Sequence, residues 1–386
     1  MAAAVQAYVT AYGTPPTTAA SASAPASGPS ETPAADPLAT ASAELDSALA
    51  AARAALRNGC TQPDFVSQLN GALSGIQADG AVPSAVLRRL TANLTGTVGT
   101  DTTVEVELGD DLSKVVATAA PGATLYLAKG EYRLKDTLVL LDGITLAGRG
   151  RQQTRLLSDA AGVSVLVMAA SLVGLRDLTV RRNPKAPGTV VTAGSSTTLA
   201  LEQVRLSGAR TDANRQGGAG LDLAGTAGAA SPGRTTVEVT DSEFLDNTWA
   251  GISVSAGHRV SVATSTFRDN GECGACFLGT AEGSIERSTF SDNGVGVAVV
   301  GSSAAVIRGN RFTGGQVGVQ VGNTATPTID GNRISSAKRA AVIFTDTAAG
   351  VVRKTRCVKV DVGIVLSAKA LPSLMDNACT LARASK

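Results

Sequence analysis

Apolar residues recur at fixed positions along most of this chain. One apolar position recurs once in every repeat unit, and it is occupied by Val239, Val262, Ile285, Ile307, Ile329, Val352 and Leu374. Five positions later stand Phe244, Phe267, Phe290, Phe312, Ile334, Cys357 and Cys379. The unit is 22 or 23 residues long, and earlier units fit at Leu175/Val180 and Leu201/Leu206. A fixed period with apolar residues two apart in short runs predicts short strands that each present one face inward.

This unit length favours one coil of a parallel β-helix, with three strands of three to five residues and three turns. The blades of β-propellers and the units of α-helical repeat proteins are longer than 23 residues. Equivalent residues of successive coils would then stack at ~4.8 Å. The phenylalanines should form an interior stack. A polar column should form a ladder that satisfies turn backbone groups: Ser242, Ser265, Ser288, Asn310, Asn332, Thr355 and Asn377.

The chain before the repeats has a different pattern. Residues 1–41 are rich in Pro, Ala, Ser and Thr and predict a disordered linker, because they offer little apolar surface to bury. Residues 42–100 carry three apolar stripes at helical spacing and predict a small helical segment. Residues 101–386 form the β-helix domain in this prediction. The start of the chain lacks a basic, apolar export signal, so either a signal has been removed or the chain is not exported.

Composition narrows the function classes. Apolar residues make up 44% of the 386 positions and aromatic residues only 3%, which suits a repeat array of small side chains. A single histidine excludes a His-rich metal site. No apolar run approaches the ~18 residues of a membrane span. Charge is uneven: residues 1–110 carry a net −6 and residues from 300 onward a net +8. An acidic partner for the C-terminal part would explain this asymmetry, and so would a solvated face of the array.

The stretch 109–157 resembles the entrance of right-handed parallel β-helix proteins of the pectate-lyase-like superfamily. In that family a short helix, here about Asp111–Ala119, caps the open end, and a G-x-x-L-x-L-x-x-G-x-Y strand begins the first coil. The later units, S-x-F-x-D-N-x-x-x-G-I-x-V, are similar to the general repeat of this superfamily. The resemblance covers about 105–381. It implies a three-sheet, all-β solenoid, shared by polysaccharide lyases, hydrolases, epimerases and non-catalytic surface proteins.

The resemblance also implies where chemistry would occur, because enzymes of this superfamily use carboxylates on the outer face of one sheet. One column should lie on that face: Asp222, Ser253, Cys276, Ala298, Gln320, Ile343 and Val365. It holds a single carboxylate, and paired-carboxylate chemistry needs two. The family's D-H, R-x-P-x-x-R and N-T-D motifs are absent from the sequence. These departures argue against pectinolytic activity of the usual kind.

An enzyme site would therefore lie at the Gly/Ala-rich insertion 208–236. Arg210, Asp212 and Arg215 precede the strand that bears Asp222, and His258 follows the next coil's first strand. An acid, a base and two guanidinium groups suit removal of a proton beside a uronate carboxylate. The alternative is a polar surface loop with ordinary ion pairs.

Three Asp-Asn pairs recur at one turn and offer a calcium site through Asp246, Asp269 and Asp292. Stacked carboxylates repel one another unless they are hydrogen-bonded or bridged by a hard cation. Capping of the turns is the other interpretation. No other cofactor is expected.

The C-terminal coils carry a basic face. Arg311, Arg333 and Arg356 share one outward column without acids, and Lys338, Arg339 and Lys354 lie near the turns. Guanidinium groups bind carboxylates and sulfates through two hydrogen bonds. The column predicts binding of an acidic polysaccharide. A neighbouring outward column, Glu286, Arg308, Asp330 and Arg353, alternates in sign and predicts a ladder of ion pairs.

Cys357 and Cys379 should face inward on adjacent coils, at a separation that suits a disulfide or two buried thiols. Cys273 and Cys276 form a lone C-x-x-C, which predicts neither zinc nor redox chemistry. Four outward apolar residues, Leu278, Val300, Ile343 and Val365, should form a patch that the N-terminal helices or a second protomer covers.

These observations favour a secreted or envelope-associated, extracytoplasmic protein that binds an acidic polysaccharide without catalysis. A polysaccharide lyase or epimerase with its site at 208–236 is the alternative. An oligomeric structural spike or adhesin is the third.

Overall fold

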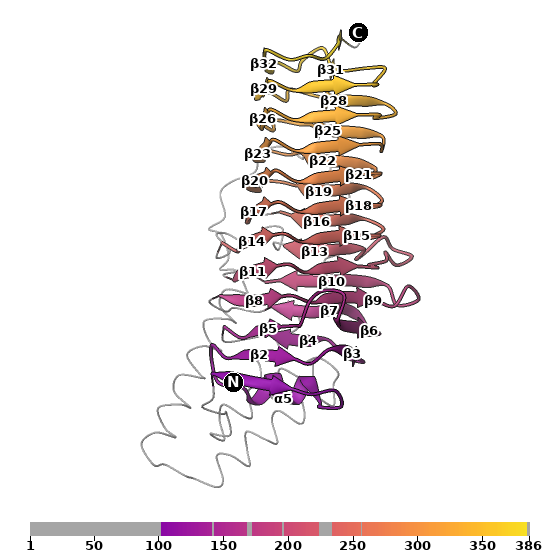
Figure 1. Ribbon diagram of the computed structural model, residues 1–386. Coiled ribbons are helices and arrows are strands. Elements are labelled where there is room, and N and C mark those ends of the chain that lie inside the picture. The colour runs from indigo at the N-terminus through magenta and orange to yellow at the C-terminus, as the bar shows by residue number, and fades with distance from the viewer. Residues whose placement is uncertain are drawn as a thin grey trace, which may run out of the picture.

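The structure is a computed structural model that describes residues 102–140, 143–167, 172–194, 197–223, 234–255 and 257–383. The predicted linker 1–41 and helical segment 42–100 lie outside the described residues. Within the described residues, the chain winds through three parallel sheets in succession, and the coils stack from α5 at one end to β32 and β33 at the other (Figure 1).

Each sheet takes one strand from most coils. Sheet A contains β1 (Thr103–Val106), β2 (Thr124–Leu127), β5 (Thr145–Ala147), β8 (Val173–Arg176), β11 (Thr198–Glu202), β14 (Thr236–Thr240), β17 (Arg259–Ala263), β20 (Glu282–Glu286), β23 (Ala304–Arg308), β26 (Thr328–Asp330), β29 (Val351–Arg353) and β32 (Ser373–Met375). Sheet B contains β3 (Gly130–Leu134), β6 (Thr154–Ser158), β9 (Thr179–Arg182), β12 (Arg205–Ser207), β15 (Glu243–Leu245), β18 (Thr266–Arg268), β21 (Thr289–Ser291), β24 (Arg311–Thr313), β27 (Arg333–Ser335) and β30 (Arg356–Val358). Sheet C contains β4 (Leu138–Leu140), β7 (Gly162–Val167), β10 (Gly188–Ala193), β13 (Ala219–Leu223), β16 (Ala250–Val254), β19 (Cys273–Phe277), β22 (Val295–Val299), β25 (Val317–Val321), β28 (Ala340–Phe344), β31 (Ile364–Leu366) and β33 (Leu381–Arg383).

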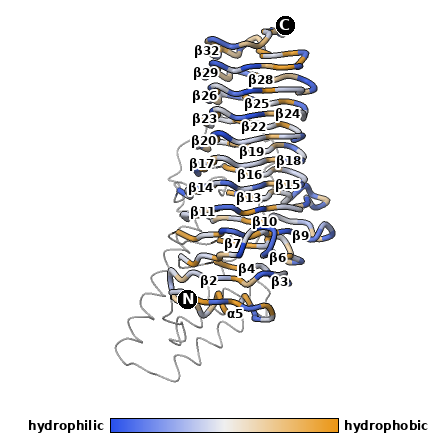
Figure 2. Tube along the Cα trace, viewed as in Figure 1, coloured by the Kyte–Doolittle hydropathy of each residue, from blue (hydrophilic) through white to orange (hydrophobic). Residues whose placement is uncertain are grey.

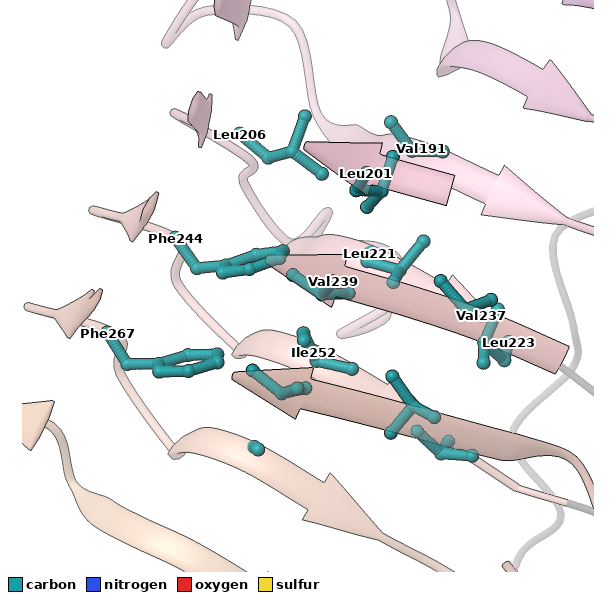
Figure 3. Close-up of a cluster of buried hydrophobic side chains, with 14 of the residues drawn as sticks. Val191, Leu201, Leu206, Leu221, Leu223, Val237, Val239, Phe244, Ile252 and Phe267 are labelled. Carbon is teal, nitrogen blue, oxygen red and sulfur yellow. The ribbon is translucent and has the colours of Figure 1, made fainter. Parts of the chain in front are cut away.

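The register predicted from the repeat is confirmed. Val239 pairs with Val262 and Val262 with Ile285 in sheet A, and Phe244 pairs with Phe267 in sheet B. These side chains are buried inside the coil with their counterparts from sheet C (Figure 3). Along the chain, hydrophobic and hydrophilic positions alternate over short distances, as strands with one buried face require (Figure 2).

The interior phenylalanines form a continuous stack. The ring centroids of Phe244 and Phe267 are 5.0 Å apart, those of Phe267 and Phe290 are 4.5 Å apart, and those of Phe290 and Phe312 are 4.7 Å apart. A column of glycines in sheet C lies against this stack, Gly220, Gly251, Gly274 and Gly296, and Gly318 continues the column against Ile334. A Cβ at Gly296 would lie 2.5 Å from Cδ1 of Phe312. The glycines therefore leave the space that the aromatic stack occupies.

Two polar ladders run through the turns. Between sheets A and B, the backbone N–H of Ser242 donates to Oγ of Ser265 (3.1 Å), and that of Asn310 donates to Oδ1 of Asn332 (2.9 Å), as the sequence predicts. Between sheets B and C, the side chain of Asn247 donates to Oδ1 of Asn270 at 3.0 Å, and Asn270 donates in turn to Asn293 at 2.9 Å. Because these asparagines are buried, the ladders satisfy backbone groups that water cannot reach.

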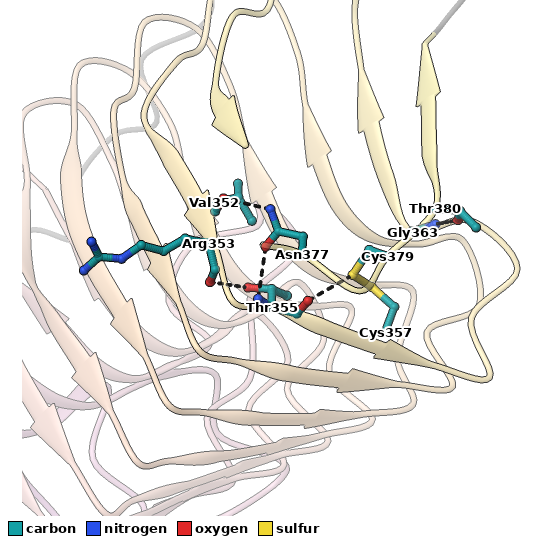
Figure 4. Close-up of a disulfide and its surroundings, with 8 residues drawn as sticks. All are labelled: Val352, Arg353, Thr355, Cys357, Gly363, Asn377, Cys379 and Thr380. Atoms are coloured by element: carbon teal, nitrogen blue, oxygen red, sulfur yellow. Dashed lines mark hydrogen bonds between the residues drawn. A yellow bond between two sulfur atoms is a disulfide. The ribbon is translucent and has the colours of Figure 1, made fainter. Parts of the chain in front are cut away.

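Both ends of the array have identifiable structure. Helix α5 (Leu112–Thr118) covers the N-terminal end with buried Leu112, Val116 and Ala117, and Asp111 accepts a hydrogen bond from the Lys114 N–H as its N-cap. This cap agrees with the predicted helix. At the C-terminal end, Cys357 and Cys379 form a disulfide across adjacent coils, beside the hydrogen bond from Thr355 N–H to Asn377 Oδ1 (Figure 4).

Candidate active site

Asp222 is the one carboxylate in the outward column of sheet C among the described residues. It lies on β13 between Leu221 and Leu223, both fully buried inside the coil, so its own side chain points outward. It pairs in register with Thr192 on one side and Ser253 on the other. Burial raises the pKa of Asp222 to about 6, while a hydrogen bond with Ser253 acts in the opposite direction. A carboxyl group with this pKa exchanges protons readily near neutral pH.

The outer face of sheet C beyond Asp222 is apolar. Buried Ala250, Cys273 and Cys276 pack with half-buried Trp249 and Leu278. A second cluster follows at Val317, Ala340 and Ile343. Trp249 is the only tryptophan of the chain, and it immediately precedes β16, the strand that carries Ser253.

The four residues of the predicted outward apolar patch are partly or largely covered. Ile343 is buried, with an exposed fraction of 9%. Leu278, Val300 and Val365 are half-buried. Neighbouring side chains of successive coils cover one another on this face, since coils stack at ~4.8 Å. Cys273 and Cys276 form a disulfide here, which the sequence did not predict.

The described part of the insertion forms a small hairpin at the corner between sheets B and C. Thr211 and Gly217 form an antiparallel bridge, and Asp212 Oδ1 accepts the backbone N–H groups of Asn214 and Gln216, each at 2.8 Å. Arg215 extends from this hairpin and forms an exposed ion pair with Glu272 at 3.2 Å.

Arg210 is held in place at the same corner. Its guanidinium donates to the carbonyl of Asp246 at 2.6 Å and to the Asp246 carboxylate at 2.9 Å. Arg210 and Asp212 therefore both stabilise the corner locally.

His258 lies at a different corner, between sheets C and A. It is fully buried, and its Nδ1 accepts the backbone N–H of Thr235 at 3.2 Å. Its Nε2 is buried and has no hydrogen-bond partner among the described residues. Burial, with a smaller contribution from Arg234, lowers the pKa of His258. The structure thus places His258 inside the turn.

The five residues predicted at the insertion are consequently distributed over two corners and one strand. Arg210, Asp212 and Arg215 share the B–C corner, and Asp222 lies on the outer face of sheet C. Of these side chains, Asp222 has a strongly perturbed pKa and Arg215 is the most exposed to solvent, with 81% of its side chain accessible. No signal in the sequence distinguished an inward-pointing His258 from a catalytic one.

The three aspartates of the Asp-Asn pairs lie exposed at the B–C corner, each with positive φ near 55°. Asp246 pairs with Arg210, and Asp269 pairs with Arg268 at 3.3 Å. Among the described residues, no group of three His, Cys, Asp or Glu side chains converges as a metal site would require.

The two charged columns of the C-terminal coils differ in their pairing. On sheet A, Arg308 lies between Glu286 (3.8 Å) and Asp330 (3.5 Å), and Arg353 pairs with Asp330 at 2.9 Å. Hydrogen bonding from Arg353 is the main cause of the lowered pKa of Asp330. On sheet B, Arg311, Arg333 and Arg356 lie in register and are exposed. Lys338 and Arg339 are exposed at the B–C corner and Lys354 at the A–B corner.

A polar hollow of about 310 Å³ lies at the corner between sheets A and B. Arg151 closes one side of it by donating to the carbonyl of Asp241 (2.6 Å) and pairing with Glu243 (3.5 Å). Arg205 also binds Glu243, at 2.6 Å. The charges of this hollow are thus largely neutralised within the protein.

Comparison with known proteins gives one match to a family model. Residues 227–377 match the family model described as a right-handed beta helix region. No curated protein matches the sequence significantly. Within the described residues, no helix is long and apolar enough to cross a membrane.

Several solved structures are similar. An alginate lyase from Paenibacillus sp. str. FPU-7 aligns with a TM-score of 0.52 and 13% identity, over 73% of this chain and 99% of that chain. The catalytic domain of a GH87 α-1,3-glucanase aligns with a TM-score of 0.49 and 10% identity, over 72% of this chain and 59% of that chain. The A-module of the Azotobacter vinelandii mannuronan C-5 epimerase AlgE6 aligns with a TM-score of 0.44 and 19% identity, over 69% and 88% respectively. The register and the three sheets show that the described residues form a parallel β-helix, in agreement with the right-handed beta helix match over residues 227–377.

Proposed function

We propose that this protein is an extracytoplasmic enzyme that acts on an acidic polysaccharide by proton transfer, the chemistry of lyases and epimerases, with Asp222 as the acid–base group. The observation that carries the proposal is the position of Asp222. It is the single carboxyl group in an outward column of otherwise uncharged residues, it bonds to Ser253, and burial holds its pKa at about 6.

A single carboxyl group can complete an elimination. The Asp222 carboxylate takes the proton from the carbon beside a uronate carboxyl group, and the electron pair of that C–H bond forms a C=C bond. The C–O bond to the next sugar breaks, and its oxygen receives the proton back from Asp222. A pKa near 6 suits both steps, because the group must accept a proton and then release it. This mechanism does not need a second carboxylate, which the outer face of sheet C lacks among the described residues.

Two side chains at the corner where β13 and β16 begin suit the remaining requirements. Negative charge develops on the substrate carboxyl group during proton removal, and a guanidinium can neutralise it. Arg215 is suited to this role, because its pair with Glu272 is exposed and exchangeable. Trp249, immediately before β16, offers a flat apolar surface for a sugar ring.

The similarity to an alginate lyase supports the fold on which this proposal stands, and the name of that protein fits the proposed reaction class. The expectation of non-catalytic binding placed all function on the basic C-terminal coils. The proposal instead assigns the chemistry to sheet C. A purely structural spike would leave the perturbed carboxyl of Asp222 without a role.

The test is to incubate the purified protein with a panel of uronate polysaccharides, alginate and pectate among them, and to follow the ultraviolet absorbance of an unsaturated uronate product. For epimerisation, proton NMR of the polymer in deuterated water reports exchange at the same carbon. Asp222→Asn should lose activity, while the matched control Asp212→Asn should keep it. Absence of both products across the panel, or full activity of Asp222→Asn, would contradict the proposal.

A further inference from the structure

One outward column of sheet B changes character along the solenoid. In the N-terminal coils its charged residues are paired with opposite charges: Arg155 with Glu131 at 3.7 Å, and Arg205 with Glu243 at 2.6 Å. Uncharged Thr266 and Thr289 follow in register. The column then ends in Arg311, Arg333 and Arg356, which are all positive.

These three arginines have no partner within the described residues. No carboxylate lies within 4.0 Å of them, and their guanidinium groups make no hydrogen bond there. Three like charges at a spacing of ~4.8 Å repel one another, so the column costs stability. The adjacent ladder on sheet A, whose charges alternate, shows that the same coils also hold a neutralised column.

A second column runs beside the arginines on the same face. Because Phe312 and Ile334 point inward from the middle of β24 and β27, the residues on both sides of each point outward. Ser291, Thr313 and Ser335 lie in register and half-buried, and the hydroxyl groups of Thr313 and Ser335 are 3.3 Å apart. Guanidinium and hydroxyl groups thus run in parallel at one repeat distance.

The surface is rigid. The rings of Phe290 and Phe312 stack beneath it, and the disulfide between Cys357 and Cys379 fixes the last coils. Lys338, Arg339 and Lys359 extend the positive charge to the nearby corner, where they are exposed and form no ion pair among the described residues. A preorganised row of donors loses little conformational entropy when a ligand binds.

From this arrangement we infer that the C-terminal half of sheet B is a binding surface for an extended acidic polysaccharide, separate from Asp222 on sheet C. Each arginine binds a carboxylate or sulfate group, and the neighbouring hydroxyl oxygens accept hydrogen bonds from sugar hydroxyl groups. The Ser335 hydroxyl donates its own proton to the Phe312 carbonyl at 3.0 Å. The repeat of the column is close to the rise per sugar of an extended chain, so successive sugars meet successive coils. The surface retains the polymer without taking part in the reaction.

The residue types on this face discriminate against other polyanions. Single-stranded nucleic acids are bound by aromatic side chains that stack on bases. The outward positions of β21, β24, β27 and β30 hold no aromatic residue among those described. An anionic membrane surface would require large apolar side chains that insert between lipids, and Val358 is the one apolar residue of these positions.

The test measures binding of defined alginate oligosaccharides by titration calorimetry, with Asp222→Asn as the background so that no polymer is consumed. Combined Arg311→Gln, Arg333→Gln and Arg356→Gln should weaken binding about tenfold or more and flatten its dependence on salt. The matched control is Lys129→Gln, Arg133→Gln and Lys135→Gln, which removes the same charge from exposed positions in the first coils and should change binding less than about twofold. The melting temperature of the arginine variant should stay equal or rise.

Equal binding by both triple variants would overturn the inference, and so would the absence of binding at low salt. Tighter binding of an oligo-dT strand or of phosphatidylserine vesicles than of alginate would also overturn it and identify a different class of partner. The outcome is independent of catalysis: a protein that binds alginate through these arginines yet cleaves nothing would refute the proposed function alone.

Discussion

The ring of Phe290 fills the space that a side chain at Gly274 would need. A Cβ at Gly274 would lie 2.6 Å from Cδ1 of Phe290 and 2.7 Å from the carbonyl oxygen of Gly296. The same relation recurs between Gly296 and Phe312 one coil further on. Gly274 and Gly296 belong to a column of sheet C in which every residue beside a phenylalanine of the stack is glycine. Ala341 occupies the same column beyond the end of the aromatic stack. The two columns are therefore complementary in volume.

Gly274→Ala should destabilise the protein by about 2–3 kcal/mol, because overpacking forces the ring or the backbone to move. Chemical denaturation measures the change in the free energy of unfolding. Adding Phe290→Leu should recover part of the loss, since the smaller side chain leaves room for the new methyl group. If the effects of the two substitutions are simply additive, Gly274 and Phe290 do not constrain one another.

The side chain of Asn270 takes part in four hydrogen bonds in the ladder between sheets B and C, one of them from the backbone N–H of Asn247 at 3.4 Å. It also accepts from the side chain of Asn247 at 3.0 Å and donates to Asn293 at 2.9 Å and to the Phe244 carbonyl at 3.0 Å. Asn270→Ala should cost about 3 kcal/mol or more, because it leaves buried polar groups without partners. The neighbouring, exposed Asp269→Asn should change the stability by less than about 0.5 kcal/mol. Equal thermal denaturation curves for the two variants would contradict the role of the ladder.

The sequence predicts the fold well because the coil repeats. Every apolar column, the phenylalanine stack and the serine–asparagine ladder appear in the predicted register, since a period of 22 or 23 residues leaves one way to superpose the strands. The Asp-Asn pairs show what the repeat pattern does not predict, namely the direction in which each side chain of a turn points. Both residues were visible in the sequence, but only the backbone shows that Asn270 turns inward while Asp269, with φ of 55°, faces solvent.

The candidate site was less predictable, because it depends on where single side chains point. The sequence predicts His258 and Asp222 together because they belong to adjacent coils beside the insertion. The structure places His258 within a turn and leaves Asp222 on the outer face of β13. The complementary glycine column was also missed, since glycines are frequent throughout the chain and their spacing gains meaning only beside Phe290 and Phe312.

His258 should make stability sensitive to acid. Its pKa is lowered in the folded state, so the unfolded chain binds the proton more tightly, and stability should fall as the pH drops below the ordinary value of 6.5. Protonation would also remove the acceptor that Thr235 uses. His258→Gln, which cannot be protonated, should show a shallower loss between about pH 6.5 and pH 5. Melting temperatures measured in the Asp222→Asn background isolate this effect, and identical slopes would refute it.

Asp222 should make the protein less stable as the pH rises, the opposite of the effect of His258. Its folded-state pKa of about 6 lies above the ordinary value of 3.8, so the folded state favours the protonated form. Its contribution to stability is present below about pH 4 and is lost as the pH rises through 6, by up to about 3 kcal/mol. Asp222→Asn should therefore be more stable than the wild type at pH 8 and nearly equal to it at pH 4. A variant that is less stable at pH 8 would show that the carboxylate is stabilised rather than desolvated.

The pH dependence of kcat/KM on a uronate polysaccharide tests the central claim most directly. The free enzyme must hold Asp222 as a carboxylate to take the proton, so kcat/KM should rise through an apparent pKa near 6 and then level off. Asp222→Asn should lose at least about a thousandfold in kcat/KM, with its circular dichroism spectrum unchanged. A wild-type profile without inflection between about pH 5 and pH 7, or an Asp222→Asn variant that retains activity, would contradict the assignment of Asp222 as the acid–base group.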